Sequence, residues 1–276
     1  MTKIEWTDKT WNPIVGCSKI STGCINCYAA EAAKSSRLQQ FSQYAHVGDW
    51  DGKVQFVESQ LCLPLTWRKP KKIFVCSMSD IFHHNIPDVW RHKVFAVAAM
   101  CPQHQFQILT KRPENMLCYF ADNPWDSIAN EIMNIEDNPC LGHLADELKE
   151  MSADDYLNNL WLGTTVENQN YADKRIPFLL HTPAKIRWLS VEPLLEKTNL
   201  DLSYSSLAET RIDWVVVGGE SGGKRRQCKV EWIKDVIQQC DSANVDIFVK
   251  QDSHRFSGQQ GRISDADWQR KEFPIS

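Results

Sequence analysis

The sequence predicts an α/β fold, a full or partial (β/α) barrel with an acidic helical insertion, in a single domain over residues 1–276. Short apolar runs recur along the chain, and most are continuous, as is typical of strands buried on both faces of a parallel sheet. Helical patterns separate several of these runs, which favours right-handed strand–helix–strand crossovers. Each run ends in polar residues, and the carboxyl ends of barrel strands converge on one active-site face.

About seven strands are expected, which is close to the eight strands of a complete barrel. The first is Ile14-Val15, which enters a cysteine-rich loop. The later strands are short apolar runs, as expected for a buried parallel sheet. They lie at residues 72–76, 106–109, 160–163, 186–189, 214–217 and 245–249.

Two stretches between strands have apolar residues at helical spacing. Residues 87–100 begin with a proline, which suits the first turn of a helix because the N–H groups there have no intrahelical partner. Residues 230–240 form the second stretch. The segment 121–155 follows the strand that ends before Lys111-Arg112, and we expect it to be a helical insertion into that strand–helix unit.

Charge is distributed unevenly along the chain. The net charge is −4, but residues 121–155 contain ten acidic residues and one lysine, a net charge of −9, which leaves +5 for the rest. Basic clusters lie at residues 68–72, 111–112 and 224–226. Runs of this kind are usually solvated surface, and contact with nucleic acid is the less common explanation. The acidic insertion is a candidate surface for a partner protein.

The composition is that of a soluble globular protein, with 42% hydrophobic and 24% charged residues. No apolar run approaches the length of a membrane span, and the first residues lack the basic and apolar regions of a signal peptide. We therefore expect a cytoplasmic protein with no membrane partner. In that reducing compartment the ten cysteines should not form disulfides, and seven of them read as buried free thiols.

Three cysteines, Cys17, Cys24 and Cys27, lie within 11 positions with the spacing C-x6-C-x2-C. A structural zinc site has four ligands, and a fourth would have to come from Cys62 or from the His83-His84 pair. A redox C-x2-C pair at a helix N-terminus is a second interpretation, and it leaves Cys17 without a role. We favour a third, a [4Fe–4S] cluster held by three thiolates, with one iron open to a reacting ligand.

Polar residues follow the predicted strands, and in a (β/α) barrel they would line one pocket with the cysteines at its rim. The glycine-rich residues 218–223 would let the main chain approach a ligand closely, and a tight turn explains them equally well. Opposite charges in such a pocket are often structural pairs. The strand-end residues are Ser77, Asp80, Lys111, Arg112, Thr164, Glu167, Ser190, Glu192, Glu220 and Lys250.

A cysteine triplet after the first strand of a (β/α) barrel resembles the motif of radical S-adenosylmethionine (SAM) enzymes, whose usual spacing is C-x3-C-x2-C. The six-residue gap between Cys17 and Cys24 departs from that spacing. The chain is more similar to a phage-associated three-cysteine-motif family of largely uncharacterised proteins, over nearly its whole length. The matching stretches are 5–8, 11–13, 16–17, 23–24, 27–29, 77–80, 109–113, 190–195, 218–222 and 250–251.

The resemblance implies a radical-SAM-type enzyme. The three cysteines would hold a [4Fe–4S] cluster, the open iron would bind S-adenosyl-L-methionine, and reduction by a flavodoxin- or ferredoxin-type electron donor would yield a 5′-deoxyadenosyl radical. A nucleic-acid base or nucleotide is the suggested substrate. Lys111, Glu192 and Lys250 are candidate catalytic residues. The candidate cofactor-binding residues are Ser77, Asp80, Thr164, Ser190, Glu192, Gly218, Gly219 and Glu220.

Two alternatives stay open at this point. One is a non-radical iron–sulfur or zinc protein that binds nucleic acid or a partner protein and uses the cysteines structurally. The other is an enzyme that uses the open iron as a Lewis acid without SAM. Visible absorption distinguishes an iron–sulfur protein from a zinc protein, and SAM cleavage under reductant distinguishes the radical enzyme from the Lewis-acid enzyme.

Overall fold

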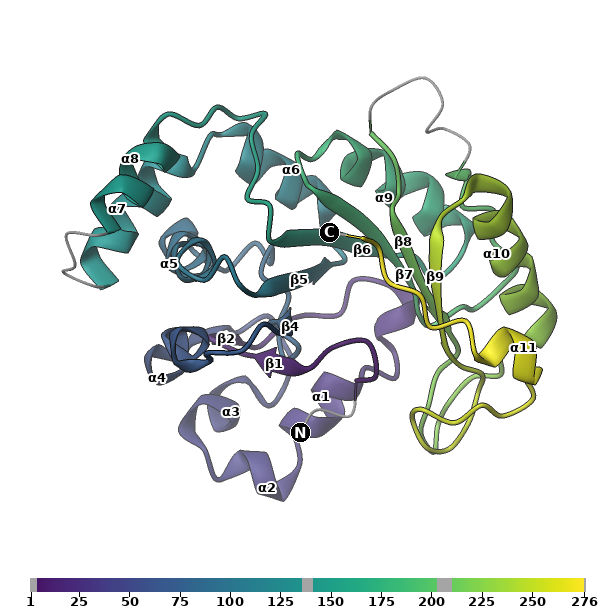
Figure 1. The fold of residues 1–276 in the computed structure, drawn as a ribbon. Helices are drawn as coiled ribbons and strands as arrows, with labels where there is room; N and C mark the ends of the chain where they lie inside the picture. Colours follow the sequence, from purple (N-terminus) through teal and green to yellow (C-terminus); the bar gives the residue numbers. More distant parts are fainter. Residues whose placement is uncertain (1–3, 136–140, 203–209, 276) are drawn as a thin grey trace.

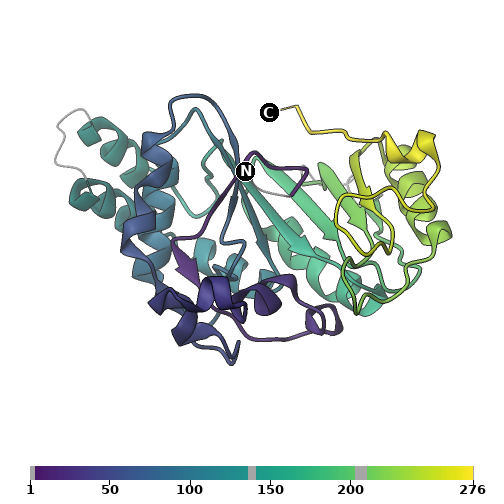
Figure 2. The same cartoon turned by 90° about the horizontal axis from the view of Figure 1, so that it is seen from below.

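The computed structural model of the protein describes residues 4–135, 141–202 and 210–275. Seven parallel strands form one sheet, and their order in the sheet is their order along the chain. The sheet curls into a half-barrel in which the edge strands β1 and β9 do not pair with each other (Figures 1 and 2). The strands are β1 (Lys9–Trp11), β4 (Lys72–Val75), β5 (Gln105–Thr110), β6 (Leu160–Thr165), β7 (Ile186–Val191), β8 (Trp214–Gly218) and β9 (Asp246–Gln251).

The α/β class and the parallel sheet are confirmed, and the barrel is partial rather than full. The prediction that Ile14-Val15 is the first strand of this sheet is wrong. These two residues form β2 (Ile14–Val15), which pairs antiparallel with β3 (Gln55–Phe56) in a separate small sheet. The first strand of the main sheet is β1, which pairs with β4. The other six predicted strands correspond to β4 through β9.

Helices cover the convex face of the half-barrel (Figure 2). The principal ones are α5 (Asp88–Ala99), α6 (Pro113–Ala121), α9 (Gln169–His181) and α10 (Val230–Ala243). The two helices expected from the sequence are α5 and α10. In the described ranges no helix combines the length and the apolar character needed to cross a membrane. Short helices complete the fold: α1 (Tyr28–Ala33), α2 (Ser36–Gln39), α3 (Ser42–Val47), α4 (Glu58–Leu61), α11 (Asp265–Trp268), and the turns η1 (Thr22–Cys24) and η2 (Leu63–Thr66).

Between α6 and β6 the chain forms two further helices, α7 (Trp125–Ile135) and α8 (Gly142–Lys149). They pack against each other, α7 also packs on α5, and the pair lies at one end of the molecule (Figure 1). Acidic side chains are exposed on and after α8, including Asp146, Glu147 and Glu150. Glu136 and Asp137 of the acidic segment lie outside the described residues.

Aromatic side chains occupy the concave face of the sheet. Along each central strand one residue faces the helices and the next faces inward, which places Trp161, Trp188 and Trp214 together away from the helices. Trp6 from the N-terminal segment packs on Trp188, with ring centroids 5.3 Å apart. A Cβ at Gly163 would lie 2.5 Å from the Trp188 ring, so this packing requires a residue without a side chain. The N-terminal segment thereby covers the concave face and borders the cavity described next.

Candidate functional site

A cavity of 210 Å³ opens at the carboxyl ends of the strands and is bordered by the cysteine loop, here residues 17–27. One wall is apolar and is formed by Trp6, Phe74 and Leu109. A second cavity, of 390 Å³, lies at the opposite end of β7, β8 and β9 and includes none of the predicted site residues. The polar wall of the first cavity contains Cys27, Lys111, Ser190, Glu192, Gly219, Glu220 and Lys250.

The cysteine loop is fixed to the sheet at its start. The N–H of Gly16 donates to the carbonyl of Met78 at 3.0 Å, and the Ser79 hydroxyl donates to the carbonyl of Gly16 at 2.7 Å. Gly16 has a φ of +96°, and a Cβ there would lie 2.2 Å from the carbonyl oxygen of Lys53. Only glycine suits that position, so the chain enters the loop on a defined path.

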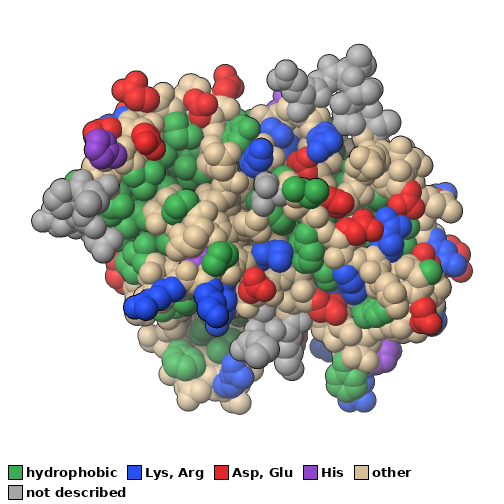
Figure 3. All heavy atoms as spheres, in the orientation of Figure 1, with side chains coloured by type: hydrophobic (Ala, Val, Ile, Leu, Met, Phe, Trp, Pro, Cys, Tyr) green, Lys and Arg blue, Asp and Glu red, His purple; other side chains and the backbone are tan. Residues whose placement is uncertain are grey.

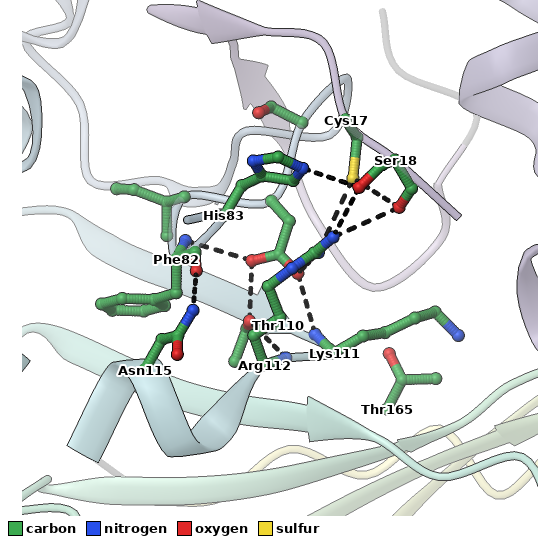
Figure 4. Close-up of polar contacts among 12 residues, drawn as sticks. Cys17, Ser18, Phe82, His83, Thr110, Lys111, Arg112, Asn115 and Thr165 are labelled. Carbon is green, nitrogen blue, oxygen red and sulfur yellow. Dashed lines mark hydrogen bonds and ion pairs between the residues drawn. The ribbon is translucent and has the colours of Figure 1, made fainter. Parts of the chain in front are cut away.

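A buried network lies beneath Cys17 (Figure 4). The Asp80 carboxylate accepts hydrogen bonds from Thr110 Oγ1 at 2.7 Å and from the guanidinium of Arg112 at 2.9 Å. Arg112 also lies 3.8 Å from the sulfur of Cys17 and 3.1 Å from the hydroxyl of Ser18. Asp80 and Arg112 are both buried and neutralise each other. Neither lines the cavity, and their role is to support the cysteine loop.

Glu167 joins the cysteine loop to β6 and α9. Its fully buried carboxylate pairs with Arg175 at 2.7 Å and with Lys111, and it accepts a hydrogen bond from the Ser21 hydroxyl. Burial alone would raise the pKa of Glu167, but the two cations outweigh it and the pKa is lowered. A Cβ at Gly23 would lie 2.5 Å from Glu167 Oε1, so the loop approaches the carboxylate as closely as backbone allows.

Glu192 and Lys250 form an ion pair in the cavity wall, with Oε2 and Nζ 3.3 Å apart. The other carboxylate oxygen, Oε1, is buried and has no hydrogen-bond partner among the described residues. Burial raises the pKa of Glu192, and Lys250 only partly opposes this. A Cβ at Gly218 would lie 2.6 Å from Oε1, so a residue with a side chain at this position would clash with the carboxylate. An unpaired buried acceptor of this kind is suited to bind a donor group of a ligand.

Glu220 connects the cysteine loop to the glycine-rich loop. It forms an ion pair with Arg226 and accepts a hydrogen bond from Asn26 Nδ2 at 3.0 Å. Burial raises the pKa of Glu220, but hydrogen bonds from Arg226 and Asn26 outweigh it and the pKa is lowered. A Cβ at Gly219 would lie 2.7 Å from Cβ of Cys228, so this turn is tightly packed. Glu220 is therefore an ionised group at the cavity wall.

The predicted site residues thus divide into two groups. The seven predicted residues of the polar wall all line the first cavity. Ser77 donates to Asn12 at 3.1 Å, and its carbonyl accepts from the hydroxyl of Tyr28. The Thr164 hydroxyl is buried and donates to the carbonyl of Thr110 at 2.9 Å. The predicted residues that do not line the cavity are Ser77, Asp80, Arg112, Thr164, Glu167, Gly218, Cys17 and Cys24.

Sequence reasoning missed several residues of the site. Arg175 neutralises Glu167 from α9, eight residues later along the chain. Asn26 and Tyr28 line the cavity beside Cys27. The position of Asn26 within the cysteine motif was an available signal for that residue. No sequence pattern identifies Arg175, because its contact with Glu167 depends on the tertiary fold.

The three thiols of the cysteine loop have different environments. Burial raises the pKa of Cys17 to about 12, with Arg112 opposing the effect. Burial also acts to raise the pKa of Cys24, but the charge of Lys111 and hydrogen bonds from Ser21 and the Ile20 backbone together outweigh it, and the pKa is lowered. Cys27 lines the cavity and lies close enough to Cys17 for their charges to interact.

The fit of an iron–sulfur cluster can be judged from these donors. Three thiols beside two cations, Lys111 and Arg112, match the donor type and the negative charge of a thiolate-bound cluster. Over residues 4–135, 141–202 and 210–275, however, no three His, Cys, Asp or Glu side chains are grouped so that they could hold a metal ion. The thiols are therefore not preassembled, and cluster binding requires their side chains to turn toward one another.

Comparison with known proteins identifies one matching family. A family model described as a protein of unknown function (DUF5131) matches residues 1–271. This range contains the cysteine loop, the whole sheet and every lining residue of the first cavity. No curated protein and no solved structure matches the chain.

Proposed function

We propose that this chain, which belongs to the DUF5131 family of proteins of unknown function, is a radical-SAM-type iron–sulfur enzyme. The observation that carries the proposal is one of position. The cysteine loop and the charged ends of four strands border the same cavity. In parallel α/β folds, ligands bind at this edge of the sheet.

Cys17, Cys24 and Cys27 are the residues that would hold a [4Fe–4S] cluster. When bound, the cluster and SAM supply a 5′-deoxyadenosyl radical that abstracts hydrogen from a substrate. Lys111 favours the ionised thiol of Cys24 and offsets negative charge at the loop. The Asp80–Arg112 and Glu167–Arg175 pairs hold the loop against the sheet.

The cavity residues would position the ligands. Glu192 Oε1 is available to accept a hydrogen bond, and Lys250 is available to an anionic group beside it. Glu220 is an ionised acceptor suited to ribose hydroxyls. Trp6, Phe74 and Leu109 form a wall that excludes water from a reactive intermediate. A flavodoxin- or ferredoxin-type protein would donate the electron, and a nucleic-acid base or nucleotide would be the substrate.

A second candidate is a protein with structural cysteines, binding zinc or a non-radical iron–sulfur cluster and a nucleic acid or protein partner. The raised pKa of Cys17 supports the form of this candidate in which Cys17 is a buried structural thiol and not a metal ligand, because zinc and iron bind the thiolate. Cys17 and Cys27 also pack against an apolar cluster that contains Ala29 and Val47.

Anaerobic reconstitution with iron and sulfide distinguishes an iron–sulfur protein from a zinc protein, and cleavage of SAM under reductant then distinguishes the radical enzyme from a non-radical iron–sulfur protein. We expect about four irons per chain and a brown thiolate-to-iron absorption band. The Cys24→Ala/Cys27→Ala variant should lose both. Cys118→Ala is the matched control, because Cys118 is an exposed free thiol on α6. Iron content equal in the double variant and the control, or binding of zinc alone, would contradict a cluster at this loop.

A further inference from the structure

Three segments at the cavity are together called the rim: residues 19–28 and 219–229, which both contribute lining residues, and residues 252–258, which follow the lining residue Gln251. Asn26 Nδ2 donates to the carbonyl of Lys224 at 2.9 Å, which joins the first segment to the second. The N–H of Gly222 donates to the carbonyl of His254 at 3.2 Å, which joins the second to the third. The last two segments form the green and yellow loops that lie side by side at the lower right of Figure 1. The rim is therefore one continuous surface.

The rim is basic although the whole protein is acidic. It contains six basic and two acidic residues, whereas the net charge of the chain is −4. The two carboxylates are buried and already paired, Glu220 with Arg226 and Asp252 with Arg262. In the part of the chain that the structure describes, the other five cations of the rim form no ion pair. They are Lys19, Lys224, Arg225, Lys229 and Arg255, and all five are exposed.

The rim also exposes large apolar side chains. Of the nine large hydrophobic residues that are exposed in the described ranges, four lie on the rim. Phe256 is 63% exposed and Tyr28 is 59% exposed. Tyr28 both lines the cavity and presents its ring to solvent, and Arg255 lies 5.8 Å from the ring centroid of Phe256. Figure 3 shows hydrophobic, basic and histidine side chains gathered at the lower right, where the green and yellow loops lie.

We propose that the rim binds single-stranded nucleic acid and delivers one base of it to the cavity. Unpaired cations neutralise backbone phosphates, and exposed aromatic rings stack on bases. A base held inside a duplex cannot enter a cavity, so a single strand or an extruded nucleotide is required. The inference deepens the proposed function by naming a polymeric substrate, and it rests on that function for the reaction at the base.

Binding of labelled oligonucleotides to the full chain tests the inference without SAM or reductant. We expect the fluorescence anisotropy of labelled single-stranded DNA or RNA to rise when the protein is added. We also expect the protein to bind the single strand more tightly than a duplex of the same length. Contact with about three phosphates gives a slope of about −2 in log affinity against log salt, or roughly a 20-fold loss between 50 and 200 mM. Parallel DNA and RNA arms identify which strand is preferred.

Matched variants locate the contact. Lys224→Ala/Arg225→Ala should flatten the salt slope by about 1.4, since each phosphate contact contributes about 0.7. Arg68→Ala/Lys69→Ala removes the same charge from the exposed turn before β4, at the other end of the sheet, and should change nothing. Phe256→Ala should weaken binding by about tenfold or more through lost stacking. Tyr156→Ala, an exposed ring before β6, is its control.

The outcomes separate the rim from the chemistry. Affinity that is independent of salt, equal binding of duplex and single strand, or equal effects of the two double variants would overturn the rim proposal. Cleavage of SAM by a protein that binds no oligonucleotide would overturn the rim proposal and leave the proposed function intact. Salt-dependent binding by a protein that never cleaves SAM would support the rim and contradict the radical chemistry.

Discussion

Lys111 forms an ion pair with the buried carboxylate of Glu167. The same ammonium group lowers the pKa of the Cys24 thiol. Lys111 leaves β5 at the cavity, Glu167 follows β6, and Cys24 lies in the cysteine loop. One lysine therefore couples the position of the loop to the ionisation of one of its thiols.

Replacing Lys111 with methionine should raise the pKa of Cys24, because the opposing charge is lost while burial remains. Each unit of increase lowers the thiolate fraction at neutral pH about tenfold. The pH dependence of Cys24 alkylation in cluster-free protein, followed by mass spectrometry, measures this. Lys174→Met on the exposed face of α9 is the control. An unchanged titration of Cys24 in Lys111→Met would disprove the coupling.

Replacing Glu167 with glutamine should destabilise the protein by about 3–5 kcal/mol at neutral pH, because Arg175 is left buried without a counter-charge. The pKa of Glu167 is lowered in the folded state. Its contribution to stability is therefore full above the ordinary value of about 4.3 and is lost as pH falls through the folded value.

Urea titrations between neutral pH and about pH 3 measure this contribution. The free energy of unfolding of the wild type should fall steeply on acidification, and that of Glu167→Gln should fall less. Glu231→Gln, at an exposed carboxylate of α10, should follow the wild type. Parallel acid slopes for the wild type and Glu167→Gln would show that this carboxylate carries no such contribution.

Replacing Gly23 with alanine should displace the cysteine loop from β6. The added Cβ would meet Glu167 within 2.5 Å, and overpacking of this kind costs about 1–3 kcal/mol. We expect a lower melting temperature and less iron retained after reconstitution. Gly223→Ala is the control, because a Cβ there meets no atom within 4 Å. Equal iron retention in the two variants would mean that the contact with Glu167 does not position the loop.

Replacing Glu220 with alanine should weaken SAM binding. The visible spectrum of the reconstituted protein should stay unchanged, because Glu220 does not ligate the cluster. Loss of one charge-assisted hydrogen bond costs about 1.5–3 kcal/mol, or roughly ten- to a hundred-fold in affinity. Titration of SAM into the two reconstituted proteins measures the difference. Equal dissociation constants would remove Glu220 from the SAM site.

The sequence predicts the sheet well because buried parallel strands are continuous apolar runs. It misassigns the first strand, since Lys9–Trp11 has no such run and becomes a strand only by pairing with β4. Ile14 and Val15 look like a strand of the main sheet but pair with Gln55 and Phe56 instead. Whether seven strands close into a barrel depends on contacts between the two edges, which no local pattern encodes.

The polar wall of the cavity is predictable because the carboxyl ends of parallel strands share one edge. Ser190, Glu192 and Lys250 meet for that reason. The partners of Asp80 and Glu167 are not predictable in the same way. Arg112 turns beneath the cysteine loop and Arg175 reaches in from α9, so both carboxylates are neutralised by cations that only the tertiary fold brings to them.

Formation of 5′-deoxyadenosine is the most direct test of a radical-SAM enzyme. The reconstituted wild type, with SAM and dithionite under anaerobic conditions, should yield 5′-deoxyadenosine and methionine in equal amounts, measured by liquid chromatography and mass spectrometry. Cys24→Ala/Cys27→Ala should yield neither product, and Cys118→Ala should match the wild type. SAM that stays intact in wild-type protein containing about four irons per chain would contradict the assignment.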